Sequence, residues 1–84
     1  MPKSIYSAAH EKLCALLRQT REDAGLRQED LAERLGRPQS FVSKIESGER
    51  RLDLIELREV CQALGTSLPK FAQKFEEGVK RLRS

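Results

Sequence analysis

Residues 31–48 read LAERLGRPQSFVSKIESG, and this stretch decides the fold because it holds two helix-like runs joined by only three residues, GRP. The first run ends at Leu35, and the second extends from Gln39 to Ser47. An isolated helix shorter than about 12 residues is marginal in water. Tertiary packing must therefore hold both runs, at an angle that their short connection fixes.

The length and the charge of the chain set limits on its organisation. With 84 residues, the chain is expected to form one domain over residues 1–84, burying roughly 60 to 65% of its unfolded surface. The net charge is +3, and 16 residues are Lys or Arg. This balance permits a polyanionic partner without requiring one, so the positions of the charges must decide.

Neither the cysteines nor the single histidine indicates a chemical site. Cys14 and Cys61 form no C-x-x-C motif, so we expect two reduced thiols that pack in the core. His10 lacks Ser, Cys or carboxylate partners at catalytic spacing, and we expect it at the surface or in helix packing. The sequence therefore predicts no metal, no cofactor and no catalytic activity.

The hydropathy pattern indicates no membrane partner. The first residues, MPKSIYSAAHEK, lack the apolar core of about 7 to 15 residues that a signal peptide has. No apolar run approaches the length of about 18 residues that a membrane-spanning helix needs. A cytoplasmic location is the expectation.

The apolar spacing predicts an all-α fold of five helices. Asp53 is a good N-cap for the fourth helix, whose apolar stripe begins at Leu54, and Ser67 can cap the fifth. No segment alternates between apolar and polar residues as a strand does. The helices are expected from residue 4 or 7 to 24, and at about 28–35, 39–47, 54–64 and 68–82.

The expected helix 39–47 has one apolar face and one polar face. Each residue advances by about 100° around a helix, so Val42 and Ile45 lie within about 60° of each other and define the core side. The opposite side is small and polar, with no acidic residue and an exposed aromatic ring beside it. It carries Gln39, Ser40, Phe41, Ser43, Lys44 and Ser47.

This polar face suits the edges of DNA bases. Glutamine can pair with adenine through two hydrogen bonds, lysine donates to guanine acceptors, and serine serves either a base or a phosphate. An ordinary solvated surface usually mixes Glu with Lys. A solvated short helix without a ligand is the alternative interpretation of this face.

Glu46 falls on the core side of the same helix, where a carboxylate needs a partner. Arg21 lies on the flank of the apolar stripe of the first helix and could reach it. The alternative is two separately solvated charges. A pair between them would hold the helix 39–47 at a fixed angle, so its role would be positional.

The stretch QEDLAERLGRPQSFVSKIESG, residues 28–48, resembles the helix-turn-helix motif of the lambda-repressor and Cro-type (XRE-like) family. The similarity extends over about residues 13–65. Arg37 and Pro38 depart from the family pattern, which has a small apolar residue in the turn and then Ser or Thr as the cap. The positions that match the family spacing are Gln28, Leu31, Ala32, Gly36, Val42, Ile45, Glu46 and Gly48.

The resemblance implies a recognition helix, residues 39–47, in the major groove of DNA, with the helix 28–35 crossing above it. It also implies the pair between Arg21 and Glu46. Together with the polar face, it predicts base contacts from Gln39, Ser40, Ser43 and Lys44. The expected phosphate contacts are Arg27, Gln28, Arg37, Phe41, Ser47, Arg50 and Arg51.

The fifth helix is a candidate dimerisation element. Phe75, Val79 and Leu82 continue its apolar stripe beyond the expected edge of the monomer core. A homodimer would place two recognition helices roughly 34 Å apart, on a pseudo-palindromic double-stranded operator.

The sequence thus predicts a compact lambda-repressor-like domain that binds specific double-stranded DNA as a small transcriptional regulator, a repressor or an autoregulator. An alternative is an antitoxin-like protein-interaction module that also binds its own operator. An enzyme is a remote third choice, because the sequence assembles no nucleophile, base or metal cluster.

Overall fold

The computed structural model describes the backbone of residues 5–82 and the side chains of residues 8–82. Within this range every regular element is a helix, which confirms the all-α, five-helix prediction. The two short helices have the predicted bounds. The helices are α1 (Ile5–Asp23), α2 (Gln28–Leu35), α3 (Gln39–Ser47), α4 (Leu54–Ala63) and α5 (Leu68–Leu82).

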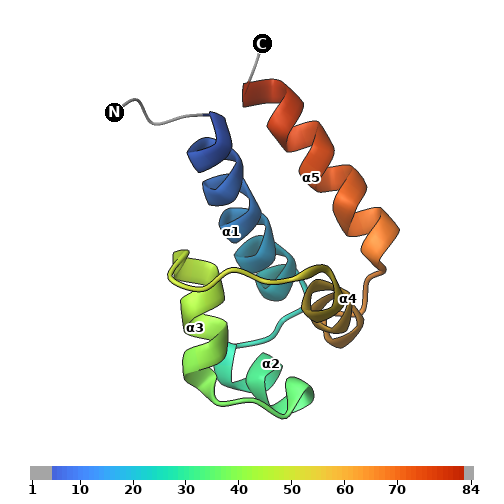
Figure 1. Ribbon diagram of the computed structural model, residues 1–84. Helices are drawn as coiled ribbons and strands as arrows, with labels where there is room; N and C mark the ends of the chain where they lie inside the picture. Colours follow the sequence, from blue (N-terminus) through green and yellow to red (C-terminus); the bar gives the residue numbers. More distant parts are fainter. Residues whose placement is uncertain (1–4, 83–84) are drawn as a thin grey trace.

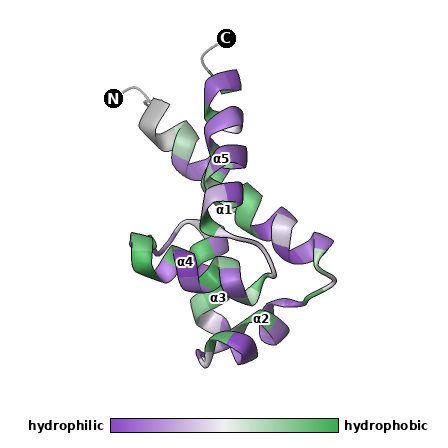
Figure 2. Ribbon diagram, turned by 90° about the vertical axis from the view of Figure 1, so that its right-hand side faces the viewer, coloured by the Kyte–Doolittle hydropathy of each residue, from purple (hydrophilic) through white to green (hydrophobic). Residues whose placement is uncertain are grey.

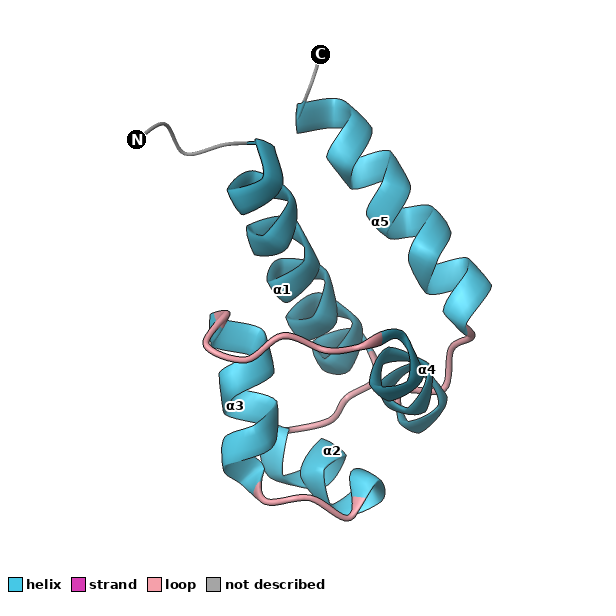
Figure 3. Cartoon of the chain, in the orientation of Figure 1, coloured by secondary structure: helices cyan, strands magenta, loops and turns pink. Residues whose placement is uncertain are grey.

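The five helices form two groups, as Figure 1 shows. The shorter helices α2, α3 and α4 lie together at one end, and α1 and α5 extend side by side toward the other end. Helix α1 also contacts α3, while α2 contacts both α3 and α4. Short loops make all the connections between these helices, and the longest of them joins α3 to α4 (Figure 3).

The core lies where these helices meet. Each helix contributes at least one side chain that is almost fully buried, for example Leu17 from α1 and Phe71 from α5. The side of α5 that faces the viewer in Figure 2 is mostly hydrophilic, as expected for a helix whose apolar stripe turns inward. The buried cluster comprises Leu17, Leu31, Ala32, Phe41, Val42, Ile45, Val60, Cys61, Leu64 and Phe71.

Two glycines end the short helices. Gly36 and Gly48 have φ of 66° and 91°, the left-handed conformation that glycine adopts without steric cost. At the start of α3, Pro38 occupies the cap position and supplies no side-chain hydrogen bond. Backbone conformation, and not a side-chain cap, therefore forms the turn between α2 and α3.

Two expectations about apolar residues are wrong. Phe41 was expected at the surface of α3, yet it is buried, with 8% of its surface exposed, because the segment after α3 returns across that side. Leu54 was expected in the core stripe of α4, yet it is 69% exposed and its neighbour Ile55 is 72% exposed. The first turn of α4 extends beyond the core, which a helical stripe alone does not reveal.

The apolar stripe of α5 is used largely within the monomer. Phe75 and Val79 are half-buried, and α5 contacts α1. The two helices approach closely at Gly78, where an added Cβ would lie 2.9 Å from Cδ of Lys12. Only Leu82, among the three residues expected to dimerise, is classed as exposed, at 43%.

Candidate nucleic-acid interface

Helix α3 presents the polar face that the sequence predicts. Gln39, Ser40, Ser43 and Lys44 are all exposed. On the other side of the helix, Val42 and Ile45 are almost fully buried. The sole acidic residue of α3, Glu46, has a buried side chain that points away from this face toward α1. The outer face of α3 thus offers amide, hydroxyl and ammonium groups to a ligand.

The predicted pair between Arg21 and Glu46 is present. Nε of Arg21 donates to Oε2 of Glu46 at 2.6 Å, and Nη2 donates to Oε1 at 3.1 Å. The side chains are only 9% and 5% exposed. The remaining Nη1 donates to the carbonyl oxygen of Leu26 at 2.8 Å. The hydrogen bond from Glu46 raises the pKa of Arg21 despite the burial of its guanidinium.

Gln28 joins this pair from the first turn of α2. Its side-chain nitrogen donates to Oε1 of Glu46 at 3.1 Å. Gln28, which was expected to contact phosphate, therefore has an internal role within the protein. A primary amide carries two N–H donors, and the second of these is the one suited to a phosphate.

A second charged group lies between α3 and α4, and we call it the arginine cluster: Arg37, Phe41, Arg50 and Glu56. The guanidinium carbons of Arg37 and Arg50 lie 4.5 Å and 4.8 Å from the ring centroid of Phe41, within the range of cation–π attraction. Glu56 accepts from Nη2 of Arg50 at 2.9 Å and from Nη1 at 3.2 Å. Nη2 of Arg37 lies 3.7 Å from the same carboxylate.

Glu56 is strongly stabilised as an anion. The two hydrogen bonds from Arg50, followed by that from the backbone N–H of Asp53, lower its pKa from 4.5 to about 2. Glu56 and Asp53 also form a capping box at the start of α4, since each side chain accepts from the backbone N–H of the other. The carboxylate thus fixes both the helix start and the arginines.

The other expected phosphate contacts differ in their surroundings. Arg27 is exposed, but its guanidinium hydrogen-bonds the carboxylate of Asp30 and lies 3.4 Å from that of Glu29. The hydroxyl of Ser47 lies 3.2 Å from both the carbonyl oxygen of Lys44 and a carboxylate oxygen of Glu49. Arg51 is exposed in the loop after α3.

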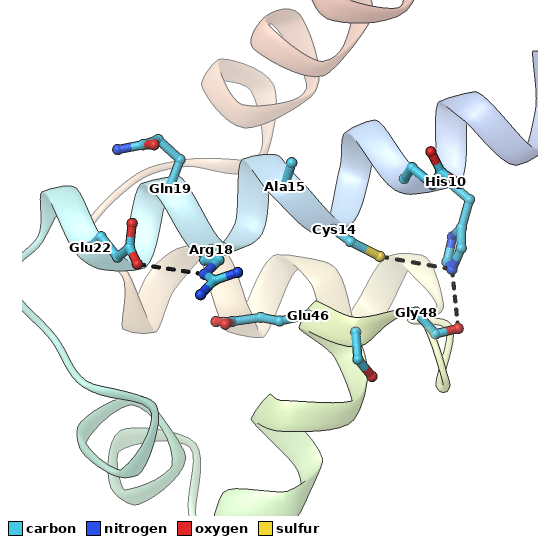
Figure 4. Close-up of a pocket in the computed structure, with 10 residues that line it drawn as sticks. His10, Cys14, Ala15, Arg18, Gln19, Glu22, Glu46 and Gly48 are labelled. Carbon is cyan, nitrogen blue, oxygen red and sulfur yellow. Dashed lines mark hydrogen bonds and ion pairs between the residues drawn. The ribbon is translucent and has the colours of Figure 1, made fainter.

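A groove of about 430 Å³ lies between α1 and the end of α3 (Figure 4). In it, Nε2 of His10 lies 3.4 Å from the carbonyl oxygen of Gly48 and 3.9 Å from Sγ of Cys14. Burial raises the pKa of the Cys14 thiol, which disfavours the thiolate form that reactive cysteines use. No metal-binding group of three His, Cys, Asp or Glu residues occurs in the described part of the chain.

This architecture has known relatives. A family described as "Helix-turn-helix domain" matches residues 12–73. The structure of an XRE-family like protein from Pseudomonas syringae pv. tomato is 48% identical, with a TM-score of 0.83 over 89% of this chain and 92% of that one. The chain is a helix-turn-helix protein of the XRE family.

Other relatives of this XRE-family chain are named as regulators. An uncharacterised HTH-type transcriptional regulator of Sinorhizobium fredii is 43% identical over 47 residues, which cover 56% of this chain and 61% of that protein. The restriction-modification controller protein C.Esp1396I is 25% identical, with a TM-score of 0.76 over 82% of this chain and 91% of that one.

No helix in the described part of the chain has the length and hydrophobicity to cross a bilayer.

One member of the interface was missed and another was misplaced. Glu56 was not expected near the arginines, although its spacing from Asp53, D-x-x-E, signals the capping box that orients it. Phe41 was expected to contact phosphate from an exposed position, but its ring lies beneath Arg37 and Arg50. The two arginines, rather than the ring, are the groups available to an anion on this side of α3.

We predict that Arg21 and Glu46 are energetically coupled. Arg21→Met or Glu46→Gln should each lower the free energy of unfolding by roughly 3 kcal/mol, because each leaves a buried charge or its donors unmatched. The double variant should lose much less than the sum of the two. Chemical denaturation of the four proteins measures the coupling.

The exposed pair of Arg18 and Glu22 is a matched control. It also joins an arginine to a glutamate, but at 3.5 Å and with side chains 67% and 50% exposed. Its coupling should be below about 1 kcal/mol. Equal coupling in the two pairs would contradict the special role of the buried one.

We predict that Glu56 makes folding stability fall in acid. Its folded-state pKa of about 2 is below its ordinary value of 4.5, so its contribution is complete above about pH 4.5 and is lost as pH falls toward 2. In Glu56→Gln, the decline in unfolding free energy between about pH 5 and pH 2 should be smaller. Denaturation of both proteins at several pH values measures the difference.

Proposed function

We propose that this protein binds a specific double-stranded DNA sequence as a small transcriptional regulator, with α3 in the major groove. The observation that carries the proposal is the outer face of α3, where Gln39, Ser40, Ser43 and Lys44 are exposed without an acidic neighbour on the face. Such side chains match the donor and acceptor pattern of base edges. The proposal includes no catalytic step.

Positive groups flank this face on the side of α4. Arg37 precedes α3 and Arg50 follows it, and both lie over Phe41. In a docked helix, basic groups along one flank are suited to the phosphates that border the groove. Gln28, at the start of α2, offers a further phosphate contact through its second amide N–H.

The relatives support a role at an operator. A single-residue variant of C.Esp1396I, 25% identical to this chain with a TM-score of 0.77, is described as bound to its highest-affinity operator site. The same protein is named a restriction-modification controller. We propose that the present chain likewise binds an operator, and that it acts there as a repressor or an autoregulator.

We also propose that the protein binds a pseudo-palindromic operator as a homodimer, because two copies would then place two recognition helices roughly 34 Å apart. Two apolar surfaces are available to a second copy. One is the end of α5, with Leu82 exposed, and the other is the first turn of α4, with Leu54 and Ile55 exposed.

The selection of bound duplexes from a random DNA pool tests the proposal. Enrichment of one motif is the expected result, and a two-fold symmetric motif would support the dimer. Uniform, salt-sensitive binding without an enriched motif would reduce the function to nonspecific DNA binding. No binding at all would overturn it.

We predict that the residues of the interface divide into those that read bases and those that hold phosphates. Lys44→Ala or Gln39→Ala should weaken binding to the selected site by about 1 to 3 kcal/mol and relax the preference at one or two base pairs. Gln28→Ala and Arg50→Ala should weaken all sequences about equally. Loss of Arg50 should also make the salt dependence shallower by about one unit.

Titrations of each variant with the selected site and its single-base variants, at several salt concentrations, measure this division. If Lys44→Ala and Gln39→Ala both lower affinity uniformly and leave every base preference intact, then α3 is not the reading element.

We predict a dimer at micromolar concentration or on DNA. In sedimentation experiments, Leu82→Ser should weaken association if α5 forms the contact, whereas Ile55→Ser should weaken it if α4 does. These exposed positions can be changed with little effect on the core. A wild-type protein that stays monomeric both free and on DNA would contradict the dimer.

A further inference from the structure

The arginine cluster has a feature that the proposed function does not require. A DNA-binding surface gains affinity from positive charge, yet the cluster places a carboxylate against its two arginines. Glu56 keeps 17% of its side chain exposed, and Arg37 and Arg50 each keep 38%. The two guanidinium groups are therefore accessible to a second anion while Glu56 binds them.

Glu56 binds Arg50 as a phosphate group would. Its two carboxylate oxygens accept from Nη1 and Nη2 of Arg50, at 3.2 Å and 2.9 Å. Arginine binds carboxylates and phosphates through the same two-pronged geometry. A DNA phosphate that takes the same donors of Arg50 must displace the carboxylate or share them with it.

The position of the carboxylate is fixed independently of the arginines. In the capping box, Oε1 of Glu56 accepts from the backbone N–H of Asp53 at 3.1 Å, which holds the carboxylate at the first turn of α4. The backbone N–H of Glu56 donates in return to Oδ1 of Asp53 at 2.7 Å. Glu56 therefore remains near the cluster when an arginine leaves it. With Glu56 in place, the two guanidiniums and one carboxylate carry one net positive charge instead of two.

We propose that Glu56 is a built-in competitor of DNA phosphate, whose carboxylate attenuates the affinity of Arg50 and Arg37 for the DNA backbone. This inference rests on the proposed function. In this role Glu56 touches no base, so it lowers affinity for every duplex and leaves base preference unchanged. It keeps a basic protein from being held on bulk DNA by charge alone.

The test compares Glu56→Gln with wild type on the selected site and on an unrelated duplex, at several salt concentrations. Glutamine keeps the size of the side chain and its role in a capping box, and thermal unfolding verifies the fold. Binding to both duplexes should tighten about three- to fivefold. The slope of log affinity against log salt should steepen by about one unit.

Glu59→Gln is the matched control. It makes the same change of charge on the same helix, at an exposed residue outside the arginine cluster, and it should change affinity less than twofold. In an Arg50→Gln background, most of the gain from Glu56→Gln should disappear.

Each outcome has one meaning. If Glu56→Gln gains no more than Glu59→Gln, or if it weakens binding because Glu56 orients Arg50 for phosphate, the inference is overturned while the proposed function stands. If the wild-type protein binds neither duplex, the proposed function fails and the inference fails with it.

Discussion

Glu46 accepts hydrogen bonds from Arg21 and Gln28, and the placement of α3 depends on this arrangement. The carboxylate is only 5% exposed, so its charge is tolerable inside the protein only because three N–H groups satisfy it. These donors come from α1 and α2, while the acceptor belongs to α3. One buried anion therefore ties together the three helices that determine how the outer face of α3 meets a ligand.

The two charged groups beside α3 differ in their exposure to solvent. The pair of Arg21 and Glu46 is buried, and its partners cannot be exchanged without leaving a charge unmatched. The contact of Arg50 with Glu56 is partly exposed, so both side chains remain accessible to solvent. The buried pair holds α3 in position, whereas the pair of Arg50 and Glu56 lies where a ligand can approach it.

Along the helix-turn-helix motif, the structure has the features that the resemblance to the XRE family implies. The bounds of α2 and α3 and the Arg21–Glu46 pair were all expected. Each follows from nearby residues or from a position on a helical face. The groove beside His10 and Cys14 was not expected, because it forms between the separate elements α1 and α3.

The helices and the polar outer face of α3 could be predicted from the amino-acid order, because apolar spacing and helix-ending glycines act over a few residues. The burial of Phe41, the exposure of Leu54 and the contact of Glu56 with Arg37 and Arg50 depend on how distant segments pack. These features depend on where the loop after α3 returns and where α4 then starts. Side chains distant in sequence are brought together by that path, which no local pattern encodes.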